Sequence, residues 1–258
     1  MGAFIHAKVE IGETAATIAA DGQYVEAAVD AIKSARKDLE RMIRRDRFFM
    51  TTFEPYTPKE EDGPVISRMC DASARVGTGP MSTVAGTIAQ VAMEAMQNRG
   101  CSHGWVDNGG DVAFILEKPA TMEIFWEPGS ESAVAMELEP TSRILGVCAS
   151  SGTLGHSISF GNADAAVAMA DSAILADALA TALGNRAIDE DALQGVFDQF
   201  KGMVGFIGGF VKFRGSIAIH GRFPKIIEVG HNPEKMTVHS RMASPAYIGC
   251  CSSHEVRP

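Results

Sequence analysis

An aspartate and a threonine lie one turn apart in an alanine-rich segment that the sequence predicts to be helical. Residues 171–185, DSAILADALATALGN, are mostly good helix formers and end in a typical helix stop. Asp177 and Thr181 are four residues apart and would share one helix face. Their oxygens suit a magnesium ion that keeps waters or ligand phosphates in its other positions. The alternatives are a local hydrogen bond between the two side chains, or a carboxylate that faces water.

We expect this helix to extend over residues 162–184. At about 100° per residue, Asp164 and Asp171 would then lie on nearly the same side of it. Asp177 would lie about 120° away from Asp171. The helical pattern therefore predicts that Asp177 stands apart from the polar stripe of the other two carboxylates.

Three loops of small residues could bring backbone N–H groups close to a ligand. GTGP, residues 77–80, precedes a predicted helix, whose unpaired N–H groups can bind an anion, but it lacks the G-x-G-x-x-G pattern of dinucleotide-binding folds. NGGD, residues 108–111, and CASSGT, residues 148–153, follow predicted strands. An ordinary tight turn also explains each loop. The candidate binding residues in these loops are Gly79, Pro80, Asn108, Gly109, Gly110, Asp111, Ser150, Ser151 and Gly152.

Hydrophobic periodicity predicts the elements that must position these residues. Strands are expected over residues 4–10, 14–20, 105–107, 112–116, 122–126 and 143–149, and in much of the chain after residue 209. Helices are expected over residues 25–43, 72–98 (interrupted by GTGP), 162–184 and 189–200, and a loop over residues 51–65. Strands, helices and strands thus follow one another twice. This grouping favours an α+β fold with antiparallel sheet over a doubly wound α/β fold.

Composition excludes several classes of function. The chain has 258 residues and a formal charge of −9, which argues against binding to nucleic acid. The basic run at residues 33–47 is best explained as the solvated face of a helix. Five cysteines without a C-x-x-C pair predict reduced thiols in a cytosolic protein. No apolar run approaches the ~20 residues that span a bilayer, so we expect a cytoplasmic protein that does not bind membranes.

Four of these segments, in order, resemble the ApbE-like superfamily, whose characterised members are FAD:protein FMN transferases. The segments are GTGPMSTVAG, NGGD, ASSG and ADALATAL, over about residues 76–183. GGD and ADALATA are the specific matches, and the chain looks closest to an uncharacterised cytosolic branch. The resemblance implies a T-fold-like α+β protein of two similar β-β-α-α-β-β halves, with antiparallel sheet and helices packed on it. It implies one domain over residues 1–258, with halves of about 1–120 and 121–258.

The resemblance also implies ligands and roles. In transferase members the helical aspartate and threonine bind Mg²⁺ against the FAD pyrophosphate, which here would make Asp177 and Thr181 the catalytic and metal-binding residues. The loop residues named above would line a pocket for FAD or FMN. FMN would move to a protein hydroxyl as AMP leaves. Since T-fold relatives often assemble through sheet edges, the resemblance is also compatible with a homo-oligomer.

The chain departs from the transferase pattern at three points. Gly79-Pro80-Met81 stands where transferases usually carry a Lys-Gly pair. Residues 155–165, GHSISFGNADA, replace an H-I-x-D-P-x-T-G segment, and no export signal is evident. Three functions therefore stay open: a Mg²⁺-dependent FMN transferase, a non-catalytic protein that binds a flavin or another small ligand, and a T-fold enzyme that acts on a small heterocycle.

Overall fold

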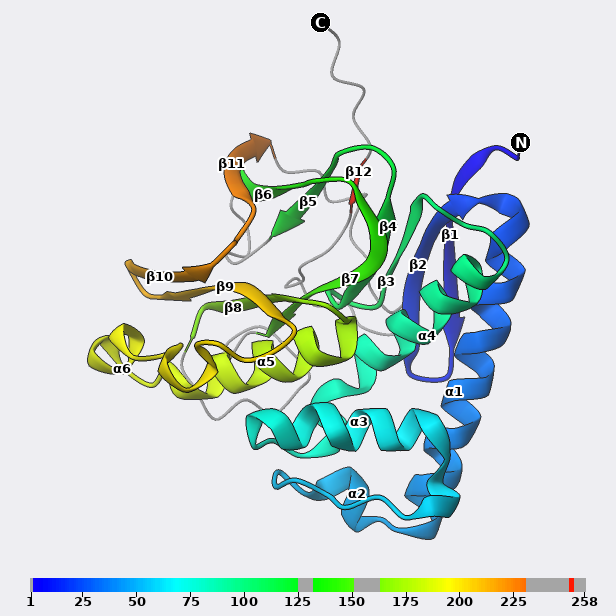
Figure 1. Ribbon diagram of the computed structural model, residues 1–258, viewed down its shortest axis with the longest axis horizontal. Coiled ribbons are helices and arrows are strands. Elements are labelled where there is room, and N and C mark those ends of the chain that lie inside the picture. Colours follow the sequence, from blue (N-terminus) through cyan, green and yellow to red (C-terminus); the bar gives the residue numbers. More distant parts are fainter. Residues whose placement is uncertain (1, 125–131, 151–162, 231–250, 253–258) are drawn as a thin grey trace, which may run out of the picture.

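The computed structural model describes residues 2–124, 132–150, 163–230 and 251–252 (Figure 1). Its helices are α1 (Val25–Arg45), α2 (Phe48–Thr51), α3 (Gly63–Val76), α4 (Val84–Asn98), α5 (Ala173–Arg186) and α6 (Glu190–Gln194). Its strands are β1 (Phe4–Ile11), β2 (Thr14–Asp21), β3 (Gly104–Asp107), β4 (Val112–Leu116), β5 (Ala120–Ile124), β6 (Ser132–Leu138), β7 (Thr141–Ser150), β8 (Ala165–Ala170), β9 (Phe206–Phe213), β10 (Ser216–Gly221), β11 (Lys225–Gly230) and β12 (Cys251–Ser252).

An eight-stranded antiparallel sheet forms the centre of the molecule, in the order β1-β2-β3-β4-β7-β8-β9-β10. The chain leaves this sheet after β4, forms β5 and β6 in a second sheet of order β11-β6-β5-β12, and returns as β7. Helices α1, α4 and α5 cover one face of the large sheet, α3 packs on these helices, and the second sheet lies on the other side of the large sheet (Figure 1). The predicted α+β fold with antiparallel sheet and packed helices is therefore confirmed, and the second sheet is an addition that the sequence pattern did not predict.

The side chains of β4 point alternately towards the helices and towards the second sheet. Ala113 and Ile115 point into the core under the helices, whereas Val112, Phe114 and Leu116 pack on the side of the second sheet. Because successive side chains of a strand point to opposite faces, a strand covered on both sides must be apolar throughout. The sequence VAFIL meets that requirement, and all five residues are buried.

The helix predicted over residues 162–184 is wrong in its first part. Ala165–Ala170 forms β8, which pairs with β7 and β9, and α5 begins only at Ala173. The Ser172 side chain accepts a hydrogen bond from the Leu175 N–H and caps this helix. Asp164 and Asp171 flank β8 and do not share a helix face, and Asp164 forms an ion pair with Lys212 at 3.6 Å. Alanine favours helices, but pairing on both sides overrides that preference here.

The helix boundaries near residues 51–65 and 189–200 also differ from the prediction. Helix α3 begins at Gly63, with proline in its first turn, so the end of the predicted loop is helical. At residues 190–200 the predicted helix is divided into α6 and a short 3-10 turn, Asp198–Phe200. Asp189 does cap α6, as predicted, by accepting a hydrogen bond from the Ala192 N–H at 2.8 Å. Trp126 and Asn162, the ends of two predicted elements, lie outside the described residues.

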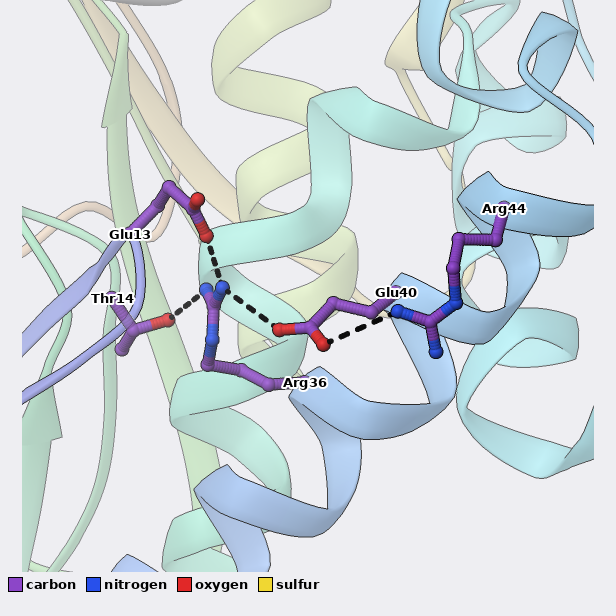
Figure 2. Close-up of polar contacts among 5 residues, drawn as sticks. All are labelled: Glu13, Thr14, Arg36, Glu40 and Arg44. Carbon is purple, nitrogen blue, oxygen red and sulfur yellow. Dashed lines mark hydrogen bonds and ion pairs between the residues drawn. The ribbon is translucent and has the colours of Figure 1, made fainter.

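A buried arginine attaches the β1–β2 turn to α1 (Figure 2). Arg36 donates hydrogen bonds to Thr14 Oγ1 at 3.0 Å and to Glu40 at 3.4 Å, and it forms an ion pair with Glu13. Glu40 in turn lies 3.7 Å from Arg44. The Arg36 side chain is only 8% exposed, whereas that of Arg44 is 69% exposed. The two arginines thus contact the same glutamate in very different environments.

Replacing Arg36 with alanine is expected to lower the free energy of unfolding by about 1–3 kcal/mol, because it removes a buried side chain and leaves the buried Thr14 hydroxyl without its donor. The matched change Arg44→Ala removes an exposed ion pair and should cost at most about 0.5 kcal/mol. Urea unfolding of both variants measures the difference. Equal losses in the two variants would contradict a structural role for the buried arginine.

Candidate functional site

The first turns of α4 and α5 approach each other unusually closely. A Cβ atom placed on Gly86 of α4 would lie 2.3 Å from the Ala173 carbonyl oxygen and 2.7 Å from Asp177 Cβ. The Gly86 N–H donates a hydrogen bond to Asp177 Oδ2 at 2.8 Å, and the Ala85 N–H also bonds to this carboxylate. Asp177 therefore occupies the N-terminus of α4, where free N–H groups and the helix dipole favour an anion.

The loop between β3 and β4 ends beside the same helix terminus. Gly109 and Gly110 have φ values of +70° and +100°, which side chains disfavour. The Asp107 carboxylate accepts the Gly110 N–H at 2.9 Å. Asn108 donates from Nδ2 to the Ala85 carbonyl oxygen at 3.1 Å. The predicted turn thus exists, and it is fixed to the start of α4.

A second buried carboxylate faces this arrangement from the start of β4. Asp111 is 8% exposed, and its Oδ1 atom has no hydrogen-bond partner in the described part of the chain. Its carboxylate receives hydrogen bonds from the Cys148 thiol and the Ala149 N–H. The Cys148 thiol also lies 3.3 Å from the Ala173 carbonyl oxygen, and its one proton can serve only one of these acceptors at a time.

Both carboxyl groups hold protons more tightly than free aspartate. Burial raises the pKa of Asp177 from 3.8 to about 7, although hydrogen bonds from Gly86 and Ala85 oppose the change. Burial, and then the charge of Asp177, raises the pKa of Asp111 well above its usual value. Burial and both aspartates also raise the pKa of the Cys148 thiol. Near neutral pH the two carboxyl groups therefore form a pair that retains at least one proton.

This pair predicts a specific dependence of stability on pH. Between about pH 4 and pH 7 the folded protein keeps a proton on Asp177 that the unfolded chain has released, so the contribution of this group falls as pH rises. The slope approaches about 1.4 kcal/mol per pH unit for one proton. We expect Asp177→Asn to be more stable than the wild type at pH 8 and this advantage to shrink towards pH 4. Urea unfolding across this range checks it, and parallel curves would contradict it.

The structure brings some of the predicted site residues together. Asp177, Asp111 and Asn108 lie around the first turn of α4, and Gly79 and Pro80 begin the 3-10 turn Pro80–Thr83 that leads into it. A Cβ on Gly79 would lie 2.0 Å from the Thr52 carbonyl oxygen, so this glycine permits a close backbone contact.

The remaining predicted residues lie further along α5, at the end of β7 or outside the described residues. Thr181 is partly exposed, one turn after Asp177 on α5. Ser150 is the last residue of β7. It lies beside Gly184 of α5, because a Cβ placed on Gly184 would be 3.6 Å from Ser150 Oγ. Ser151 and Gly152 lie outside the described residues.

Three residues at this site escaped the sequence analysis. Asp107 stands directly before NGGD, and Cys148 is the first residue of the predicted CASSGT loop but was not among its candidate residues. Gly86 lies in the segment MSTVAGT after GTGP and looked like an ordinary helix residue. No local pattern distinguishes it, because the reason for a glycine there is a helix almost 90 residues later in the chain.

The oxygen ligands available here are few. In the described part of the chain, no group of three or more His, Cys, Asp or Glu side chains is arranged to hold a metal ion. Two carboxylates alone still suit Mg²⁺, which binds to proteins through one or two carboxylates and fills its other positions with waters and phosphates.

None of the described helices is long and apolar enough to cross a membrane.

The fold is that of the ApbE flavin transferases. The apo flavinyl transferase ApbE of Pseudomonas stutzeri superimposes with a TM-score of 0.56 over 84% of this chain and 94% of that one, at 14% identity. The flavin transferase ApbE of Vibrio cholerae gives a TM-score of 0.57 over 85% and 97%, at 12% identity. At these identities the similarity establishes the architecture alone.

The chain belongs to the family described as AbpE bacteria, whose model matches residues 2–196. A UPF0280 protein of Methanocella arvoryzae is 43% identical over 237 residues, which cover 90% of this chain and 94% of the relative. A UPF0280 protein of Methanosarcina barkeri is 40% identical over 230 residues, 88% of this chain and 91% of the relative. The ApbE-like resemblance expected from the sequence, and its uncharacterised branch, are thus confirmed.

Proposed function

We propose that the protein binds a flavin nucleotide together with Mg²⁺ at Asp111 and Asp177, and that it transfers FMN from FAD to a hydroxyl group. One observation carries this proposal. The buried Asp111 carboxylate has an oxygen, Oδ1, without a hydrogen-bond partner in the described residues, and this carboxylate interacts electrostatically with the buried carboxylate of Asp177. Holding two carboxylates together in the protein interior costs stability. A divalent cation that replaces the proton retained by this pair would reduce that cost.

The residues present fit such a cation. Asp111 has an oxygen free of hydrogen bonds, and Asp177 has one carboxylate oxygen that accepts the Gly86 N–H. Thr181, on the same helix as Asp177, could add a hydroxyl oxygen. When bound, the cation would neutralise charge on the pyrophosphate of FAD.

The chain's own groups would orient the nucleotide. Gly109 is exposed and has no side chain to cover its backbone, and Asn108 fixes the turn between β3 and β4 to α4. In the proposed transfer, an acceptor hydroxyl oxygen bonds to the phosphorus of the FMN moiety. The bond from that phosphorus to the bridging oxygen breaks, AMP leaves, and the hydroxyl proton is released to solvent.

A second candidate, a protein that binds the flavin without transferring it, is favoured by the turn at Gly79. Here the backbone packs against the Thr52 carbonyl oxygen, at the position where the resemblance places a lysine in transferases. This turn therefore offers no basic side chain to the phosphates. A cytoplasmic location, a homo-oligomer and a single domain of two halves stay predictions.

The wild-type protein with FAD and Mg²⁺ tests these candidates. We expect FAD with Mg²⁺ to raise the melting temperature, and AMP to appear when a hydroxyl acceptor such as a threonine-containing peptide is added. The control is FAD with EDTA, which should give neither. Stabilisation without AMP would favour binding alone, and the absence of both effects would refute the flavin proposal.

A further inference from the structure

A buried glutamine on α4 connects the site to the protein surface. Gln90 is 4% exposed. Its Oε1 atom accepts a hydrogen bond from the Ala173 N–H at 2.8 Å, and its Nε2 group donates to Glu94 Oε1 at 2.9 Å. The amide cannot be reversed, because its NH₂ group would then face an N–H donor and its oxygen would face a carboxylate.

An ion pair from the neighbouring helix fixes the orientation of Glu94. Arg68 of α3 donates two hydrogen bonds to this carboxylate, at 2.8 and 2.6 Å. Two parallel bonds of this kind define the plane of the carboxylate as well as its position. Burial opposes ionisation of Glu94, but Arg68 and Gln90 outweigh it and lower its pKa. A continuous polar chain thus runs from α3 through α4 to the first residue of α5.

Contacts from two elements, α4 and β7, meet at this first residue of α5. Gly86 and Gln90 are one turn apart on α4, and both contact Ala173. From the sheet, Gly146 approaches so closely that a Cβ there would lie 2.2 Å from Ala173 Cα, and the Cys148 thiol lies 3.3 Å from its carbonyl oxygen. Packing therefore limits how near α5 can come to α4 and β7, whereas the hydrogen bond from the Ala173 N–H to Gln90 fixes the orientation of the first turn of α5.

We propose that Gln90, oriented by Arg68 and Glu94, is a positioning residue that holds the first turn of α5 so that Asp177 faces Asp111. Asp177 is one turn beyond Ala173, so a shift of this turn moves its carboxylate by a similar amount. Capping alone does not require Gln90, because Ser172 already caps α5. A buried and fully paired polar chain is suited to selecting one geometry among closely packed alternatives. The inference rests on the proposed cation site at Asp111 and Asp177.

The test combines an isosteric substitution with a rescue. Gln90→Met keeps the shape of the side chain and removes the acceptor, and Gln90→Glu places two carboxylates side by side. In both variants we expect Mn²⁺ affinity, measured by electron paramagnetic resonance, to fall at least tenfold. The double variant Q90E/E94Q exchanges the amide and the carboxylate, and it should return to within about threefold of the wild type. Gln97→Met, the same change on the same helix, serves as the control and should leave the affinity unchanged.

Crystal structures of the wild type and Q90M give a second measurement that needs neither metal nor flavin. We expect the distance between the nearest oxygens of Asp111 and Asp177 to change by at least about 1 Å, a fraction of the helix rise per turn. The proposal is overturned if Q90M loses thermal stability without this displacement, or if the double variant binds no better than Q90E. If the wild type itself does not bind Mn²⁺, the proposed function fails, and the displacement alone then decides the positioning role.

Discussion

Asp177→Asn is expected to lower FAD-dependent AMP release at least ~100-fold, the usual scale for removing one group that stabilises charge in the transition state. The asparagine oxygen can still accept the Gly86 N–H, so α4 should keep its cap. What is lost is the negative charge that a cation needs. Mg²⁺ affinity should fall with the rate, and isothermal titration with the metal alone measures it even if the protein binds flavin without transferring it.

The same substitution should make the protein more stable, which separates loss of function from loss of fold. At pH 8 it removes a buried charge beside Asp111, and we expect a gain of at least ~1 kcal/mol in the free energy of unfolding. The matched control is Asp171→Asn, an exposed carboxylate two residues before α5, which should change neither quantity. A destabilised D177N, or one with undiminished Mg²⁺ affinity, would show that this carboxylate serves only as a cap for α4.

Gly86→Ala is expected to lower the free energy of unfolding by about 3 kcal/mol or more. The added Cβ would lie 2.3 Å from the Ala173 carbonyl oxygen, and backbone cannot move aside as a flexible side chain can. The higher helix propensity of alanine would offset only about 1 kcal/mol of this loss in the free energy of unfolding. Because the helices must separate, Mg²⁺ affinity should fall as well. Urea unfolding and metal titration measure the two effects.

The matched control is Gly184→Ala, a glycine on α5 whose added Cβ would meet its nearest neighbour, Ser150 Oγ, at an ordinary 3.6 Å. This change should be neutral or stabilise the protein by up to about 1 kcal/mol through helix propensity alone. Similar unfolding free energies for the two variants would mean that α4 and α5 are further apart than the structure indicates.

The architecture was predictable because its strands carry strong patterns. The hairpin over β1 and β2 and the strands around NGGD follow from alternation and turn residues. Strand β8 was missed because AAVAMA carries no alternation and has a high helix propensity, and its strand conformation depends on pairing with β7 and β9. Ser172, a good N-cap residue, was the local sign that α5 begins later.

The sequence could name residues of the candidate site but not their arrangement. Asp177 and Asp111 were both identified, the first from helical spacing and the second from the GGD turn. Their electrostatic interaction joins positions 66 residues apart, and no local pattern reports it. The partners of Asp177 are backbone N–H groups of α4, which have no signature in the sequence.

Strands β4 and β7 are neighbours in the large sheet, but the chain between them leaves that sheet to form β5 and β6. In the sequence, Asp111 precedes this β5–β6 segment and Asp177 follows it. Two separately expressed fragments, cut between β4 and β7, would each carry one carboxylate of the acidic pair, so we expect neither alone to bind the proposed cation. If the proposed cation site is present, reassociation of the two fragments should restore metal binding, and metal binding would then report whether the two fragments have met.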